Sequence, residues 1–202
     1  MRSYKRGQQR FFDNLVAFLA SFTSLGTAME IYSQSKFREW QRGEHITIEG
    51  MPHVTGIDLQ FQPRPLLDLL GGNEWPSVIG LADPPNTRAP QYNTALTVLF
   101  RYRVLASLIS SAFVAYYETV KPLAKAKFGK NTQGWPEVWK FGRTSRNAFA
   151  HDGKIEIRNR DASPVTWRSL RYGPGHNGRQ ILFQDISPVE VILLMEEMDS
   201  AL

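Results

Sequence analysis

The chain has 202 residues, of which 42% are hydrophobic, so it is long and apolar enough to bury a single core and is not intrinsically disordered. It carries 24 Lys and Arg against 19 Asp and Glu, a formal net charge of +5, which favours a polyanionic partner such as nucleic acid. It contains no cysteine, which excludes disulfides, thiolate zinc sites and a cysteine nucleophile and is typical of a cytoplasmic protein.

The N-terminal segment places basic residues before an apolar stretch, as secretory signal peptides do. However, Asp13 and Asn14 interrupt the apolar run, and no small-residue cleavage site follows. Apolar residues recur at helical spacing from Phe11 onward, which predicts a long first helix that reaches about Trp40, with a weak point at Gly26. No apolar stretch approaches the roughly 20 residues needed to span a bilayer, so we expect a soluble protein without a membrane partner.

A β-hairpin is expected next, at residues 45–62. Two short runs there alternate apolar and polar residues on either side of the turn-forming sequence GMPH. Residues 62–91 hold most of the prolines and a glycine pair, which predicts a loop-rich excursion around one short helix.

The second half of the chain is predicted to be mostly helical. From Asn93, nearly thirty residues without glycine or proline are apolar on most faces, which predicts a central buried helix. Pro122 is expected to begin a separate short helix. A further helix should run from Pro136 to Gly153, and the last should begin at the N-cap Ser187.

A second β-hairpin is expected within residues 154–184. Its two predicted strands are KIEIR, at 154–158, and VTWRSLRY, at 165–172. The sequence therefore predicts one mainly α domain spanning residues 1–202, a helical bundle that carries two small β-hairpins.

The helix predicted before Gly153 ends in a strongly polar run. Arg143, Asn147 and His151 recur at offsets of four and eight, so they lie on one stripe, and Asn147 is one turn before His151 and can hydrogen-bond its ring. Arg146 lies about 100 degrees round the helix from Asn147, within reach of a long side chain. The stripe predicts a concave, cationic and titratable site. The ordinary alternative is a histidine that suits the helix dipole beside solvated arginines.

The hexapeptide RNAFAH, residues 146–151, resembles the R-x4-H signature of the HEPN superfamily (higher eukaryote and prokaryote nucleotide-binding domains), including the asparagine directly after the arginine. As in that family, it lies at the end of a helix late in a predicted helical bundle and is followed by a small residue. The resemblance covers residues 93–202 together with the first helix. The two hairpins and the proline-rich segment have no counterpart in it.

The resemblance implies an activity. Many members of the superfamily are metal-independent endoribonucleases of toxin-antitoxin and defence systems that act as homodimers with facing motifs. It implies that RNA is cut by attack of its own 2′-hydroxyl, which leaves a 2′,3′-cyclic phosphate, without metal or cofactor. His151 would then transfer protons, Arg146 would stabilise the phosphorane charge and Asn147 would orient the histidine. Candidate partners are RNA, a second copy of the chain, and an antitoxin or another protein.

Further cations near the motif could bind RNA. If the second hairpin folds back beside the motif helix, they would form a positive track, with Trp167 or Tyr172 available to stack on a base. The equal alternative is a solvated hairpin whose aromatic side chains cover the bundle. The candidate RNA-binding residues are Arg143, Lys154, Arg158, Arg168 and Arg171.

Two other function classes stay open. A non-catalytic HEPN-like module could use the same residues to bind a nucleotide, RNA or a protein, and an unrelated helical protein could carry the motif by coincidence. Metal-assisted hydrolysis is disfavoured because no paired acidic or His-x-His cluster accompanies the motif. His45 and His53 flank the first predicted hairpin and could be metal ligands, but exposed turn histidines are commoner. His176 lies in a glycine-rich turn, and we assign none of the three a function.

Overall fold

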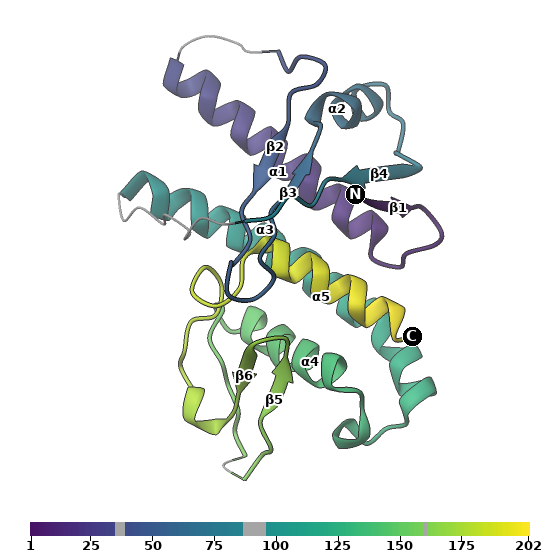
Figure 1. The fold of residues 1–202 in the computed structure, drawn as a ribbon, viewed down its shortest axis with the longest axis vertical. Helices are drawn as coiled ribbons and strands as arrows, with labels where there is room; N and C mark the ends of the chain where they lie inside the picture. Colours follow the sequence, from purple (N-terminus) through teal and green to yellow (C-terminus); the bar gives the residue numbers. More distant parts are fainter. Residues whose placement is uncertain (35–38, 87–95, 160) are drawn as a thin grey trace.

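The described part of the chain is mainly α-helical, as the sequence predicts (Figure 1). The computed structural model describes residues 1–34, 39–86, 96–159 and 161–202. Its helices are α1 (Phe12–Gln34), α2 (Pro63–Gly71), α3 (Leu96–Phe128), α4 (Glu137–Ala150) and α5 (Pro188–Ser200). The strands are β1 (Arg2–Lys5), β2 (Ile46–Ile48), β3 (Leu59–Phe61), β4 (Val78–Leu81), β5 (Val165–Trp167) and β6 (Leu170–Tyr172), and two 3₁₀ turns are η1 (Thr132–Gly134) and η2 (Pro174–His176).

The long helix α3 forms the centre of the core. It runs through the middle of the molecule in Figure 1, and α1, α4 and α5 all pack against it. Its contact with α4 is aromatic, because Phe113 meets Phe149 edge to face at 5.3 Å between ring centroids and Tyr117 lies 5.8 Å from Trp139. Such pairs contribute roughly 0.5–1.5 kcal/mol each beyond the area they bury, so they fix α4 against α3.

Helix α3 differs from the prediction at Pro122. The helix continues through this proline to Phe128, and no separate helix begins there. A proline in a helix interior removes one hydrogen bond and costs about 3 kcal/mol. Val120 and Ala124 on either side of it are fully buried, so tertiary packing outweighs this cost. The predicted start at Asn93 lies outside the described residues.

Helix α1 is shorter than predicted. It passes through Gly26 without a break and is helical to Gln34, the last residue described there, whereas Glu39 and Trp40 are not helical. The stretch 35–38 of the predicted helix lies outside the described residues. None of the helices in the described ranges combines the length and the apolar character needed to cross a membrane.

The first predicted hairpin is confirmed. Strands β2 and β3 pair antiparallel with Ile46 opposite Phe61. The loop between them is fastened to the start of α5, where Ser187 and Glu190 form the predicted N-cap as a capping box. The same Glu190 carboxylate accepts hydrogen bonds from the Met51 amide, at 2.8 Å, and from the Thr55 hydroxyl. Because Glu190 is fully buried, these bonds tie the hairpin loop firmly to α5.

The prediction for residues 62–91 is incomplete. The segment contains the expected short helix, α2, but also the strand β4, which pairs antiparallel with β1 at the N-terminus. The register places Arg2 opposite Leu81. Each strand has only four residues, and its partner lies far away in the sequence, so local alternation could not reveal the pair. Residues 87–91 lie outside the described ranges.

The second predicted hairpin is wrong in its pairing. Both strands, β5 and β6, form within VTWRSLRY, because Arg168 and Ser169 make a two-residue turn between Trp167 and Leu170. Arg168 adopts the left-handed conformation there, with φ 52°. The segment KIEIR is not a regular strand. It contacts a later part of the chain instead, because the Ile155 amide donates to the Arg179 carbonyl at 3.0 Å.

Helix α4 ends where the sequence predicts. Its last residue is Ala150, and His151 is the C-cap. Gly153 lies in the left-handed region, with φ 75°, and its amide donates to the Ala148 carbonyl at 2.8 Å. A Cβ atom at Gly153 would lie only 2.3 Å from Nε2 of Gln180. Glycine therefore lets the chain turn away directly after the histidine.

Candidate functional site

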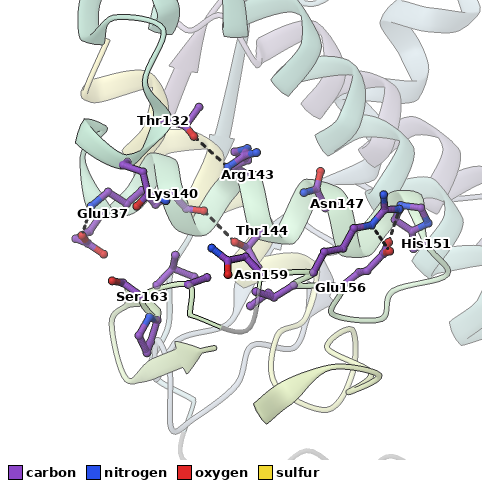
Figure 2. Close-up of a pocket in the computed structure, with 16 residues that line it drawn as sticks. Thr132, Glu137, Lys140, Arg143, Thr144, Asn147, His151, Glu156, Asn159 and Ser163 are labelled. Carbon is purple, nitrogen blue, oxygen red and sulfur yellow. Dashed lines mark hydrogen bonds and ion pairs between the residues drawn. The ribbon is translucent and has the colours of Figure 1, made fainter. Parts of the chain in front are cut away.

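One face of α4 lines an open cavity of about 640 Å³. Arg143, Asn147 and His151 all border this cavity, as their helical spacing predicts, and Asn147 lies between the other two along the helix (Figure 2). The segment that follows α4 also lines the cavity, through residues 156–159 and 162–165. The predicted polar stripe is therefore brought together at one cavity.

His151 is accessible and is held by a carboxylate. Its side chain is 54% exposed, and its Nε2 atom lies 3.2 Å from Oε2 of Glu156. Arg158 donates from Nε to the other carboxylate oxygen of Glu156 at 2.8 Å. The hydrogen bond from Arg158, together with the field of His151, lowers the pKa of Glu156 below its usual range. Glu156 is therefore a carboxylate at neutral pH, able to fix the tautomer and direction of the imidazole ring.

The side chain that contacts His151 is that of Glu156 and not, as the sequence predicted, that of Asn147. The Asn147 side chain borders the cavity, yet in the described part of the chain it makes no hydrogen bond with the His151 ring. The sequence did not indicate Glu156, because the segment KIEIR was predicted as a strand that pairs elsewhere. Its irregular backbone instead brings the carboxylate back to the end of α4 (Figure 2).

Arg146, the arginine of the R-x4-H pattern, does not border the cavity. Its Nη2 atom lies 2.8 Å from Oε1 of Glu118 on α3, with the two side chains 30% and 40% exposed. Partial burial acts to raise the pKa of Glu118, but Lys121 and Arg146 outweigh it and lower the pKa below its ordinary value. The charge of Arg146 is therefore already compensated between two helices.

Among the described residues, three permanent cations border the cavity. Lys140 pairs with Glu137 at 2.7 Å, and Arg158 pairs with Glu156. Arg143 is exposed, and its Nη1 atom donates to the Thr132 hydroxyl at 3.1 Å. No carboxylate within the described residues forms an ion pair with Arg143.

The predicted RNA-binding residues do not all meet at this cavity. Arg143 and Arg158 border it, whereas Lys154 and Arg171 are exposed elsewhere on the surface. Arg168, in the turn of the β5–β6 hairpin, pairs with Glu197 of α5 at 2.6 Å. The hairpin does fold back onto α4, but its arginines do not extend the cavity wall.

The two aromatic side chains proposed to stack on bases are buried. Trp167 is 5% and Tyr172 2% exposed. Phe141 of α4 packs against both rings, with centroids 5.5 Å and 5.2 Å away. Trp167 also donates to Glu197 and Tyr172 to Asp185. The stacking prediction is therefore wrong, and its alternative, aromatic side chains that cover the bundle, is confirmed.

The remaining histidines lie apart from the cavity. His45 borders a second, smaller cavity beside β3, and the Nδ1 atom of His176 accepts a hydrogen bond from the Gly173 amide. In the ranges that the structure describes, no three His, Asp or Glu side chains are grouped so that they could bind a metal ion together.

No family model, curated protein or solved structure matches this chain.

Proposed function

We propose that this protein is a metal-independent endoribonuclease of HEPN type, acting at the cavity beside α4. The observation that carries the proposal is an exposed histidine, held by a carboxylate, that borders an open and cationic cavity. Histidine can give or accept a proton near neutral pH, and arginine offers permanent donors to phosphate oxygens. The R-x4-H resemblance supplies the reaction class. The toxin-antitoxin or defence context and the protein partner are proposed on that resemblance alone, and the cytoplasmic location on the absence of cysteine.

The proposed reaction is a transesterification within the RNA. A base removes the proton of a 2′-hydroxyl, the 2′-oxygen bonds to the adjacent phosphorus, and the bond from phosphorus to the 5′-oxygen breaks. An acid protonates that 5′-oxygen, so the products are a 2′,3′-cyclic phosphate and a 5′-hydroxyl. His151 serves as one of these two groups, with Glu156 holding its ring.

The second proton-transfer group would come from a second copy of the chain. The cavity contains one histidine, whereas the reaction is served best by an acid and a base. A twofold homodimer that places both copies of His151 at one cleft would supply the pair, since isologous dimers repeat each contact about the axis. The homodimer is part of the proposal.

A non-catalytic RNA-binding module is the second candidate. The position of Arg146 favours it, because the arginine that should stabilise the transition state is instead paired with Glu118. The cations that border the cavity could bind phosphate without cutting the chain.

Incubation of the purified protein with a mixed RNA pool, with and without EDTA, separates the two candidates. A nuclease of the proposed type yields fragments with 2′,3′-cyclic phosphate ends at the same rate in EDTA, and a 2′-deoxy substitution at the mapped cleavage position blocks cutting. RNA that is bound but not cut would support the non-catalytic binding module. A strict requirement for magnesium would rule out the proposed mechanism.

A further inference from the structure

Two arginines of α4 have opposite surroundings, and the difference concerns which of them meets RNA. Arg143 borders the cavity, while Arg146, three residues later, does not. We propose that Arg143 binds a phosphate of the RNA backbone and that Arg146 fastens α4 to α3 through Glu118. This inference rests on the proposed function, since it takes RNA to be the ligand of the cavity.

The surroundings of Arg146 are those of a structural ion pair. Its partner Glu118 belongs to α3, which packs closely against α4. The Nε atom of Arg146 is buried and has no hydrogen-bond partner among the described residues. A phosphate that reached Arg146 would have to compete with a carboxylate already 2.8 Å away, and moving the side chain would leave Glu118 without this partner.

The surroundings of Arg143 leave its charge and most of its N–H donors available to bind an anion. The guanidinium group has five N–H donors, and the Thr132 hydroxyl of η1 takes one from Nη1. This single neutral contact directs the side chain without neutralising its charge. Lys140 and Arg158, the other permanent cations that border the cavity in the described ranges, have carboxylate partners. Of these three cations, Arg143 should therefore bind a phosphate most strongly, through charge-assisted and bidentate hydrogen bonds.

The helix fixes where that phosphate would lie. Arg143 precedes His151 by eight residues, roughly 12 Å along the helix axis at about 1.5 Å per residue. This separation is too large for both side chains to act on one phosphorus atom. Arg143 therefore binds a phosphate next to the scissile one, at which His151 transfers a proton, and the RNA strand runs along α4.

The test is the affinity for a short single-stranded RNA in which every sugar is 2′-O-methylated, so that it cannot be cut by its own 2′-oxygen. Binding is measured over a series of salt concentrations for the wild type and for Arg143→Ala, Arg143→Lys, Arg146→Ala and Arg103→Ala. Arg103 is a matched control, because it is an exposed arginine of α3 that does not border the cavity.

Arg143→Ala should bind about tenfold or more weakly and should flatten the slope of log affinity against log salt by about 0.7, the value for one lost phosphate contact on a single strand. Arg143→Lys should keep the slope, because it keeps the charge. Arg146→Ala and Arg103→Ala should bind like the wild type. Arg146→Ala and Glu118→Gln should each lower the thermal midpoint by up to about 2–4 °C, the equivalent of one modest ion pair, while Arg143→Ala leaves it unchanged.

Two outcomes would overturn the inference. One is a loss of affinity and of salt dependence in Arg146→Ala or Arg103→Ala equal to that in Arg143→Ala. The other is a wild type that does not bind the RNA. Failure of the proposed function is recognised separately, because a wild type that leaves unmodified RNA intact while the binding pattern holds contradicts the nuclease and supports Arg143 as the phosphate contact.

Discussion

The chemistry of the cavity depends on how individual charges are neutralised. Glu156 lies between Arg158 and His151, so one carboxylate serves both a cation and a titratable ring. The hydrogen bond from Arg158 keeps Glu156 ionised, and an ionised carboxylate is a stronger partner for the imidazole nitrogen that it faces than an amide would be. The geometry therefore makes Glu156 the positioning residue for His151.

Replacing Glu156 should impair turnover more than binding. Glu156→Gln should lower kcat for RNA cleavage by about tenfold or more with little change in KM, because a misdirected imidazole fails in the transition state. Asn147→Ala is the matched control from the same cavity and should have a smaller effect. Glu156→Asp should restore part of the loss. Steady-state kinetics on a fluorescent RNA measure all three variants, and an equal loss for Asn147→Ala would return the orienting role to the asparagine.

The Arg146–Glu118 ion pair predicts how the stability of the folded protein changes with pH. The pKa of Glu118 is lowered in the folded protein, so the pair contributes stability above the unfolded pKa of about 4.3 and loses it as the pH falls through the lower folded value. Titration of the Glu118 carboxyl carbon by NMR should give a pKa below the ordinary glutamate value, and Arg146→Ala should raise it. A Glu118 that titrates at its ordinary pKa in the wild type would contradict the pair.

Helices and strands were predicted well where neighbouring residues determine them, and poorly where contacts between distant parts of the chain determine them. The β2–β3 hairpin, the Ser187 cap and the end of α4 at His151 follow from turn residues, caps and periodicity. The continuation of α3 through Pro122 depends on burial of both flanks, which no local rule contains. The pairing of β1 with β4 likewise depends on residues far apart in the sequence.

The same division applies to the candidate site. Helical spacing alone placed Arg143, Asn147 and His151 at one cavity. Spacing could not show that Arg146 turns to α3, because its partner Glu118 belongs to another helix. It could not show Glu156 either, because this carboxylate lies on an irregular segment whose path is fixed by contacts with residues 177–180.

Two glycines in different elements should respond in opposite directions to the same substitution. Gly153→Ala should lower the free energy of unfolding by about 1–2 kcal/mol, because its φ of 75° suits an L-residue poorly and the new Cβ atom meets Gln180. Gly26→Ala, on the open side of α1, should raise it by up to about 1 kcal/mol. Urea denaturation measures both. An unchanged or higher midpoint for Gly153→Ala would show that the turn after α4 does not need glycine.

For the whole molecule, the proposed chemistry predicts a homodimer with its cavities at the twofold axis. Light scattering at micromolar concentration should give twice the mass of the 23.0 kDa chain. Because the sequence lacks cysteine, Asn159→Cys allows one spin label per chain at the cavity rim, and the two labels should lie close together. A monomer, or labels on opposite outer faces, would contradict this arrangement.

The most direct measurement is the cleavage rate of His151→Ala against the wild type on one RNA in the presence of EDTA. We expect the variant to cut at least about 10² to 10³ fold more slowly, the scale of lost acid-base catalysis, while its affinity for uncleavable RNA falls much less. Wild-type fragments should end in 2′,3′-cyclic phosphate. Cleavage by His151→Ala at the wild-type rate would contradict an active site at the end of α4.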